Sequence, residues 1–447
     1  MSPVPPTPPV TRSTRAALIA GVCLLVALVY LFADVIGPRG RAAVGIACFI
    51  LIVAALSSNL RAVSWRTVGW GLALQFSLAL FILKLEVGGV RPGYVLFGAV
   101  ARAVARFLEF TNAGSRFVFG GLADPDVLSK VLPDGFVFAF TALPTIIFAS
   151  SFFAMLYHLG ILQVVVRAMA WVMTGFMGTS GAETLSAAAN VFLGQTEAPI
   201  IVRPYVPAMT QSELLSLMVG GLATISGGIM AVYIALGADP IAILTTSVMA
   251  APCGLYLSKL MLPETERPAT RGEVTVGPER THVNLIDAIS AGASDGLALA
   301  LNVAAMLIVF LAFIALCDFL LGWLSPRLTL AGVFAWLFAP VALLMGVPSG
   351  DVPAVADLLG TKLVANEFVA FVKLTTTYEG VISERGHVLS TFALTGFANF
   401  GSIGILLGGI GGMAPARRPD VARLGLRALL VGFLVTMINA SIAALLM

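Results

Sequence analysis

The chain has 447 residues, of which 59% are hydrophobic and 11% are charged. Soluble globular domains are about 45–50% apolar and about 25% charged, so this composition excludes an ordinary soluble protein and indicates a polytopic helical membrane protein. The net charge of +3 is small for this length and gives no indication of nucleic-acid binding.

Residues 1–15 carry five prolines and two arginines and predict a short flexible tail. The apolar run at residues 16–33 has no clear small-residue cleavage site, so we expect an uncleaved first span; a cleaved signal peptide is the alternative. Further apolar stretches are long enough to cross a bilayer and predict about nine transmembrane helices in all. They are residues 42–58, 67–83, 135–157, 214–236, 241–257, 297–317, 388–410 and 424–447.

The lysines and arginines of the short connections favour an N-terminus inside the cell and a C-terminus outside. The inner side then receives basic residues from Arg61 and Arg66 to the segment between Lys259 and Arg280. This alternation requires residues 86–130 to lie outside as an amphipathic interfacial helix. Basic residues alternate with apolar ones there: Arg102, Arg106 and Arg116.

The cysteines and histidines are isolated from one another along the chain. They are Cys23, Cys48, Cys253, Cys317, His158, His282 and His387. Without a CxxC or Cys/His spacing, this pattern argues against disulfides and against a zinc or other imidazole-built metal site.

Two regions, residues 178–204 and 340–367, are too apolar for loops and too interrupted by glycine and proline for ordinary spans. Backbone of this kind is tolerated at membrane depth only where protein or a watery cavity satisfies its polar groups. We therefore expect re-entrant helical hairpins at about 178–204 and about 330–367. Each is followed by a break in a helix, near 223–228 and near 397–402. Paired interruptions in two halves of a chain point to a transporter's midplane binding site, although glycines that serve only close helix packing are the alternative.

The expected fold class is thus an all-α polytopic membrane protein with two re-entrant hairpins in an inverted repeat. Its expected parts are a tail (1–15), N-terminal scaffold helices with the interfacial helix (16–134), a first repeat (135–262), a cytoplasmic loop (263–290) and a second repeat with the C-terminal helix (291–447).

Polar side chains at the interruptions predict a hydrogen-bonding site. Gln195 and Asn399 offer donors and acceptors, Thr196 and Ser402 hydroxyls, and Glu197 and Glu367 acceptors only. Carboxylates at such depth are costly and are functional candidates by default. The set suits a neutral polyhydroxylated solute, and we expect both acidic tips to face one shared aqueous cavity. Two nearby basic residues, Arg203 and Lys362, are interpreted as interfacial or helix-end charges.

A second group of oxygens could hold a hard monovalent cation. Asn190 and Thr224 supply side-chain oxygens, and the carbonyls of Leu193 and Ile225 fall where unwinding is expected. Helix capping by the same side chains is the alternative.

Several long motifs closely resemble the concentrative nucleoside transporters, of the sodium-coupled type, from about residue 42 to the C-terminus. They are GQTEAP at 194–199, MAAPCGLYLSKLMLPE at 249–264, LMGVP at 344–348, TKLVANEFVAF at 361–371 and GFANFGSIGILLGG at 396–409. The resemblance implies a homotrimer in which a transport domain, made of two hairpins and unwound helices, moves against a scaffold domain.

The resemblance also assigns roles to residues of this chain. It implies a nucleobase site at Gly194, Gln195, Thr196, Glu197 and Ile229, a ribose site at Glu367, Phe397, Asn399 and Ser402, and a sodium site at Asn190, Leu193, Thr224 and Ile225. Phe397 either stacks on the ligand or simply packs.

The chain departs from the family pattern in three places. Residues 16–33 form an extra N-terminal helix relative to short bacterial members, as if part of the longer animal-type N-terminus were retained. Thr224 stands where some members have Ser and keeps the hydroxyl. Gly401 stands where Ser is usual and could loosen that helix break.

The sequence therefore predicts a non-enzymatic symporter of the bacterial inner (plasma) membrane that imports uridine-like nucleosides with sodium as coupling ion. Proton coupling through Glu197 or Glu367 is the first alternative. An intramembrane enzyme using both carboxylates as acid and base is disfavoured, because no nucleophile lies beside a base. A passive channel is disfavoured because two hairpins suit an occluding site.

Overall fold

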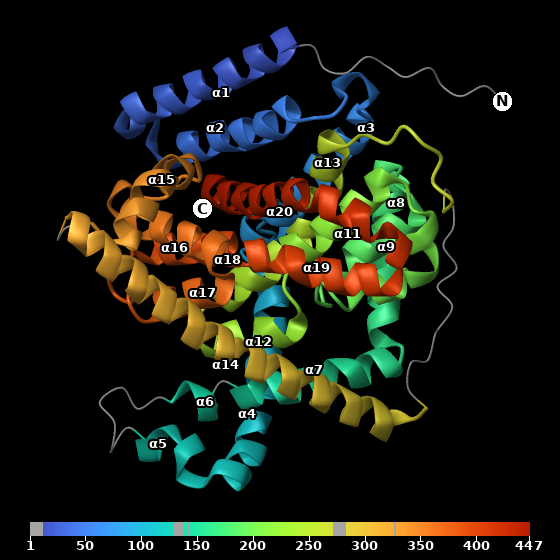
Figure 1. Cartoon of the computed structure of the whole chain (residues 1–447), viewed down its shortest axis with the longest axis vertical. Helices are drawn as coiled ribbons and strands as arrows, with labels where there is room; N and C mark the ends of the chain where they lie inside the picture. The colour runs from blue at the N-terminus through green and yellow to red at the C-terminus, as the bar shows by residue number, and fades with distance from the viewer. Residues whose placement is uncertain (1–11, 129–136, 142, 271–282, 326–327) are drawn as a thin grey trace.

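A computed structural model describes residues 12–128, 137–141, 143–270, 283–325 and 328–447, and these are almost entirely helical (Figure 1). Within this part of the chain the only strand-like pairing is one bridge between Val87 and Val90. Helices satisfy their own backbone polar groups, as a chain this apolar requires inside a bilayer. The predicted all-α polytopic class is confirmed.

Helices α1 and α2 pack on each other along one side of the molecule, whereas α4, α5 and α6 lie at the opposite end (Figure 1). Only Val29 of α1 is buried. Gly37, with φ 67°, breaks α2 just before Pro38, since a left-handed residue and a proline both interrupt helical hydrogen bonding. The bounds are α1 Arg12–Leu31, α2 Ala33–Ala55, η1 Leu60–Ala62, α3 Trp65–Leu83, α4 Pro92–Phe119, η2 Gly120–Ala123, α5 Pro125–Leu128 and α6 Phe138–Thr141.

The helices α7 (Leu143–His158) and α14 (Leu285–Leu324) form a closely packed pair on the side away from α1 (Figure 1). Gly292 and Gly296, one turn apart, allow this approach: a methyl group at Gly292 would lie 2.8 Å from the Ser151 Cα. Helix α8 (Ile161–Met177) follows α7 after a 73° bend at Gly160, whose φ is 81°.

The remaining chain repeats one order of elements twice: short helices, an interrupted helix and a long helix. The first set is α9 Gly181–Ala189, α10 Ala198–Ile201, η3 Arg203–Ala208, α11 Gln211–Ala223, α12 Gly227–Ala235 and α13 Pro240–Met261. The second is α15 Leu330–Leu344, η4 Ser349–Asp351, α16 Val352–Val364, α17 Glu367–Thr375, α18 Glu384–Leu394, α19 Phe400–Met413, η5 Pro415–Arg417 and α20 Arg418–Leu446.

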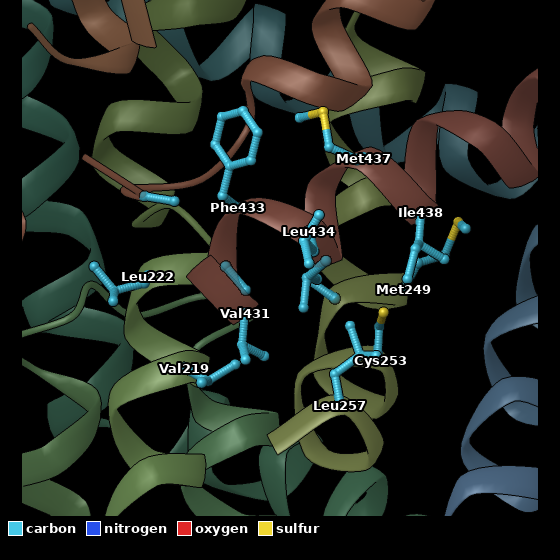
Figure 2. Close-up of a cluster of buried hydrophobic side chains, with 14 of the residues drawn as sticks. Val219, Leu222, Met249, Cys253, Leu257, Val431, Phe433, Leu434, Met437 and Ile438 are labelled. Carbon is cyan, nitrogen blue, oxygen red and sulfur yellow. The ribbon is translucent and has the colours of Figure 1, made fainter. Parts of the chain in front are cut away.

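The core lies where α11, α13 and α20 meet, as the side chains labelled in Figure 2 show. Hydrogen bonds between buried polar side chains accompany this apolar contact. Gln75 of α3 donates to the Asn439 Oδ1 over 2.6 Å and accepts from the Tyr256 hydroxyl over 2.9 Å, while the Asn439 Nδ2 donates to the Thr246 Oγ1 over 2.9 Å. These hydrogen bonds join α3, α13 and α20, and they fix the rotation of each helix about its axis.

Some element bounds differ from the prediction. In the described part of the chain six helices are long and apolar enough to cross a membrane, or seven if the α7–α8 pair counts as one span, so the expected nine stays a prediction. The segment predicted as the second hairpin, 330–367, contains two breaks. One, at Gly346 and Pro348, separates α15 from α16; the other, at residues 365–366, separates α16 from α17. Helix α8 was not predicted.

The long loop also differs. Helix α14 begins at Leu285, before the end of the predicted loop 263–290, and extends well beyond the predicted span 297–317. Residues 271–282 of that loop, and most of the predicted tail 1–15, lie outside the described residues.

Candidate functional site

The segment predicted as the first hairpin, and called so below, turns between α9 and α10, and this turn, its tip, lies against the break between α11 and α12. The Gly227 N–H donates to the Phe192 carbonyl over 2.9 Å, and a methyl group at Gly194 would lie 3.2 Å from the Ser226 Cβ. The Gly194 N–H donates to the Glu197 Oε2 over 3.0 Å, which closes the turn. A side chain at position 194 would therefore crowd Ser226.

The base of the same hairpin is held by a buried ionic cluster. Lys259 of α13 lies 2.7 Å from the Glu183 Oε2 and 3.2 Å from the Glu264 Oε2. Glu213 of α11 accepts from the Ser180 hydroxyl over 2.5 Å. Glu183 and Glu213 also close capping boxes at the starts of α9 and α11. Sequence reasoning missed this cluster, although an S/T-x-x-E pattern precedes both helices.

The break between α18 and α19 meets the break between α11 and α12. The Phe397 N–H donates to the Thr224 carbonyl over 3.2 Å. Gly396, with φ 150°, lies close enough to the Ala223 carbonyl that a methyl group would be 3.1 Å from its oxygen. Both breaks predicted near 223–228 and 397–402 are present, and the second falls at residues 395–399.

A hydrogen-bond series connects residues of the two halves. The Gln195 Nε2 is 3.4 Å from the Ser402 Oγ. The Ser402 N–H donates to the Asn399 Oδ1 over 2.9 Å, and the Asn399 Nδ2 donates to the Glu367 Oε2 over 2.9 Å. All four side chains are buried. The structure thus brings together four of the predicted ligand-binding residues.

Tyr233 of α12 completes the series, and the sequence analysis did not single it out. Its hydroxyl donates to the Glu367 Oε1 over 3.1 Å, and its ring stacks on Phe371 at 4.1 Å. The carboxylate of Glu367 therefore has one donor from each repeat. The sequence signal that could have identified Tyr233 is its position seven residues after Ser226, which caps the same helix.

The predicted cation ligands lie around the hairpin tip with unused acceptors. The Asn190 Nδ2 donates to the Ser186 carbonyl over 2.9 Å, while its Oδ1 is buried with no hydrogen-bond donor in the described part of the chain. A methyl group at Gly220 would lie 2.8 Å from the Asn190 Nδ2, which places this side chain against α11. The Thr224 hydroxyl donates to the Gly220 carbonyl over 2.9 Å and keeps its lone pairs.

The carbonyls of Leu193 and Ile225 complete this oxygen set. Neither accepts a hydrogen bond from another residue that the structure describes. Uncharged oxygens from two breaks suit a hard monovalent cation better than a transition metal, which would recruit imidazole or thiolate. An orphaned buried amide oxygen is costly unless a ligand or ion satisfies it. The residues present therefore fit a sodium ion.

Glu197 borders a cavity of about 150 Å³ between the first hairpin, α12, α7 and α14. Its lining includes the aromatic Phe153, Tyr157 and Phe192, the capping Ser226, and a second carboxylate, Asp295 of α14. Glu367 does not border it and is instead enclosed by Asn399 and Tyr233. This cavity therefore includes one of the two acidic tips, and the expectation that both face one shared cavity stays a prediction.

The other predicted ligand-binding residues differ in their exposure and in their neighbours. Thr196 is exposed, and its Cγ2 lies near Gly409 of α19. Ile229 is 3% exposed in the first turn of α12, and Phe397 is half-buried beside the break. Neither borders the cavity.

Of the two interpretations given for Lys362, an interfacial or a helix-end charge, the structure supports the second. Lys362 is fully buried, and its ammonium donates to the Ala393 carbonyl over 2.6 Å and to the Thr436 hydroxyl over 2.9 Å. Ala393 is in the last turn of α18, so the cation does lie at a helix end, where it interacts favourably with the helix dipole. Arg203 is exposed, as expected.

Family profiles match most of the chain. The profile for the C-terminus of Na+-dependent nucleoside transporters matches residues 242–444, the profile for their N-terminus matches residues 44–122, and a nucleoside-recognition profile matches residues 139–240.

Individual relatives agree with the profiles. Sodium/nucleoside cotransporter 1 of Mus musculus is 44% identical over 90% of this chain, which spans 63% of that relative's length. An uncharacterized transporter of Haemophilus influenzae is 45% identical over 90% of this chain and 96% of its own. Solved structures of CNTnw cover 91% of this chain and 97% of theirs: an inward-facing substrate-bound state has TM-score 0.85 at 38% identity, and an outward-facing variant has TM-score 0.85 at 37%.

Proposed function

The chain belongs to the Na+-dependent nucleoside transporter family, and from this premise we propose that it is a secondary active symporter that imports nucleosides with sodium. The observation that carries the proposal is the buried series from Gln195 through Ser402 and Asn399 to Glu367, next to the orphaned Asn190 Oδ1. A polar ligand and a cation would bind at the same junction of two broken helices.

The substrate class follows from the donors and acceptors in the series. Glu367 is acceptor-only, which suits sugar hydroxyls, and charge-assisted bonds to a carboxylate are the stronger kind. We assign the ribose to Glu367, Asn399 and Ser402, with Phe397 beside it. We assign the nucleobase to the first hairpin tip, Gly194 to Glu197, with Ile229 in the following helix. No residue of the chain is assigned a catalytic role.

Sodium would bind at Asn190, Leu193, Thr224 and Ile225. Its binding would satisfy the buried Asn190 Oδ1 and join the hairpin tip to the break in α11–α12. The tip also carries Gln195 and Glu197, so fixing it raises nucleoside affinity. By linkage, nucleoside raises sodium affinity by the same factor. One positive charge moving inward gains about 2.3 kcal/mol per 100 mV of membrane potential.

Transport would proceed by alternating access, with the two hairpins moving against α7 and α14. The inward- and outward-facing states of CNTnw support such a cycle for the family. We further propose a homotrimer in the bacterial inner membrane, in contact with lipid, with the N-terminus inside and the C-terminus outside. The amphipathic α4 would lie at the membrane surface.

Uptake of labelled uridine into proteoliposomes tests the proposal. We expect accumulation only with an inward sodium gradient, increased by an inside-negative potential. Uptake driven by a pH gradient and indifferent to sodium would select proton coupling instead. Uptake that only equilibrates uridine, with neither ion gradient having an effect, would contradict active transport.

A further inference from the structure

The cavity beside Glu197 has acidic residues on two walls that belong to different parts of the fold. Glu197 is on the first hairpin tip, and Asp295 is on α14. Both are exposed, and no lysine, arginine or histidine lines the cavity among the described residues. A ligand here therefore meets two negative charges and no fixed positive charge.

The two carboxylates retain free acceptor oxygens. Glu197 uses its Oε2 for the Gly194 N–H. Asp295 forms no hydrogen bond or ion pair with any residue that the structure describes. An ionised carboxylate can only accept, so each can receive N–H groups from a ligand and repels a ligand's carbonyl oxygen.

The remaining walls suit a flat heterocycle. Phe153 of α7 and Phe192 of the hairpin supply aromatic rings, and Tyr157 and Ser226 add polar groups. Sites of this kind combine apolar faces with a few placed polar groups that decide specificity. Glu197 is already assigned to the nucleobase, so the heterocycle that fits here is the base of the transported nucleoside.

Asp295 is held at a fixed place on its wall. Gly292 and Gly296 on either side of it pack against α7, so close that methyl groups there would approach Ser151 and Ile147 backbone atoms to 2.8 and 2.7 Å. The carboxylate therefore projects from the tightest part of the α7–α14 pair. Glu197, by contrast, belongs to the hairpin tip that the proposed cycle moves.

Nucleobases differ in what they present at one position of their edge. Cytosine and adenine carry an exocyclic amino group, a donor, where uracil and hypoxanthine carry a carbonyl oxygen, an acceptor. Resting on the proposed function, we infer that Asp295 is a specificity-determining residue: together with Glu197 it accepts from the exocyclic amino group, so the transporter prefers cytidine to uridine and adenosine to inosine.

Equilibrium binding to the purified full chain in detergent micelles tests this inference. Dissociation constants for cytidine, uridine, adenosine and inosine are measured at one fixed sodium concentration. Each amino–oxo pair shares its ring size and ribose, so the ratio within a pair cancels stacking and sugar contacts. We expect Asp295→Asn to lower both amino-over-oxo affinity ratios, taken as the ratio of 1/Kd, about tenfold, because one charge-assisted bond is lost and the new amide also donates to the oxo group.

Asp287→Asn is the matched control. It removes the same charge from the first turn of the same helix, where Asp287 accepts from the Val283 N–H outside the cavity, and should leave both ratios unchanged. Ratios that are equal in wild type and Asp295→Asn, with all four nucleosides bound, overturn the inference and leave the proposed function intact. A uniform loss of affinity for all four with altered sodium dependence also overturns it, since Asp295 would then serve the cation. Failure of wild type to bind any nucleoside overturns the proposed function itself.

Discussion

Replacing Glu367 with glutamine isolates the charge of the central carboxylate. The variant keeps the side chain's shape but exchanges one acceptor oxygen for an NH2 group. Asn399 can continue to donate to the remaining oxygen, from its present 2.9 Å. The Tyr233 hydroxyl, now donating over 3.1 Å, can reverse and accept from the new NH2, because a phenol both donates and accepts.

The internal bonds therefore survive in neutral form, and the fold should be retained. The bound nucleoside loses more binding free energy than the internal bonds lose. A hydrogen bond to a charged group contributes about 1.5–3 kcal/mol and a neutral one about 0.5–1.5, so each sugar hydroxyl at this position loses about 1–2 kcal/mol. This corresponds to an increase in the uridine Kd of about 5- to 30-fold.

The assay is uridine binding at saturating sodium, with size-exclusion chromatography to confirm that the variant remains assembled. Tyr233→Phe is the matched control, since it removes one donor to Glu367 and leaves the charge. Its Kd should change by less than that of Glu367→Gln. Wild-type affinity in a well-folded Glu367→Gln would refute a ribose contact at this carboxylate. A collapse in expression of Glu367→Gln alone would show instead that the charge is structural.

Three further substitutions follow from the contacts around the first hairpin. Asn190→Ala removes the orphaned acceptor and should raise the sodium concentration for half-maximal uptake about tenfold or more, measured as uptake against sodium. Lys259→Met leaves buried carboxylates unpaired and should lower the free energy of unfolding by about 3–5 kcal/mol, seen as a lower Tm in detergent; adding Glu183→Gln should restore part of it. Gly227→Ala forces a methyl group into the ring of Phe153 and should cost about 1–3 kcal/mol, which Phe153→Ala should partly recover.

Specific results would contradict these expectations. An unchanged sodium dependence in Asn190→Ala would exclude that amide as a cation ligand. If the Lys259 and Glu183 substitutions were simply additive, the pair would not act as a coupled unit. A Gly227→Ala variant with wild-type Tm would mean that the Phe153 ring can move aside without cost.

The helix breaks were predictable from residues 223–228 and 396–402 because glycine and serine runs interrupt strongly apolar stretches. Gln195, Asn399 and Ser402 were predictable as ligand candidates for a related reason: amides and hydroxyls at such depth need partners. The proximity of these residues, by contrast, depends on how the helices pack against one another. Residues of the second half lie beside residues of the first only because the two breaks cross at Gly396 and Ala223.

The features that were not predictable from the sequence depend on where side chains point and on which turn ends each helix. The segment predicted as the second hairpin contains two turns, at Gly346 and Pro348 and at Ala365 and Asn366, and the second of them ends α16 and caps α17. Lys362 was interpreted as an interfacial or helix-end charge, and its burial was not predictable, since sequence spacing does not reveal the Ala393 carbonyl to which it donates. Asp295 was not singled out, because its place opposite Glu197 follows from the packing of α14 on α7 and not from a local pattern.

The glycine-faced contact of α12 with α7 has an energetic consequence for the proposed cycle. Gly227 and Gly228 present backbone to α7, so this surface of α12 is smooth. Sliding along a smooth surface requires few rotamer changes and breaks few bonds. The activation barrier would then be set at the polar tip, by the same contacts that ligand and ion rearrange, which lets occupancy of the site control the speed of the motion.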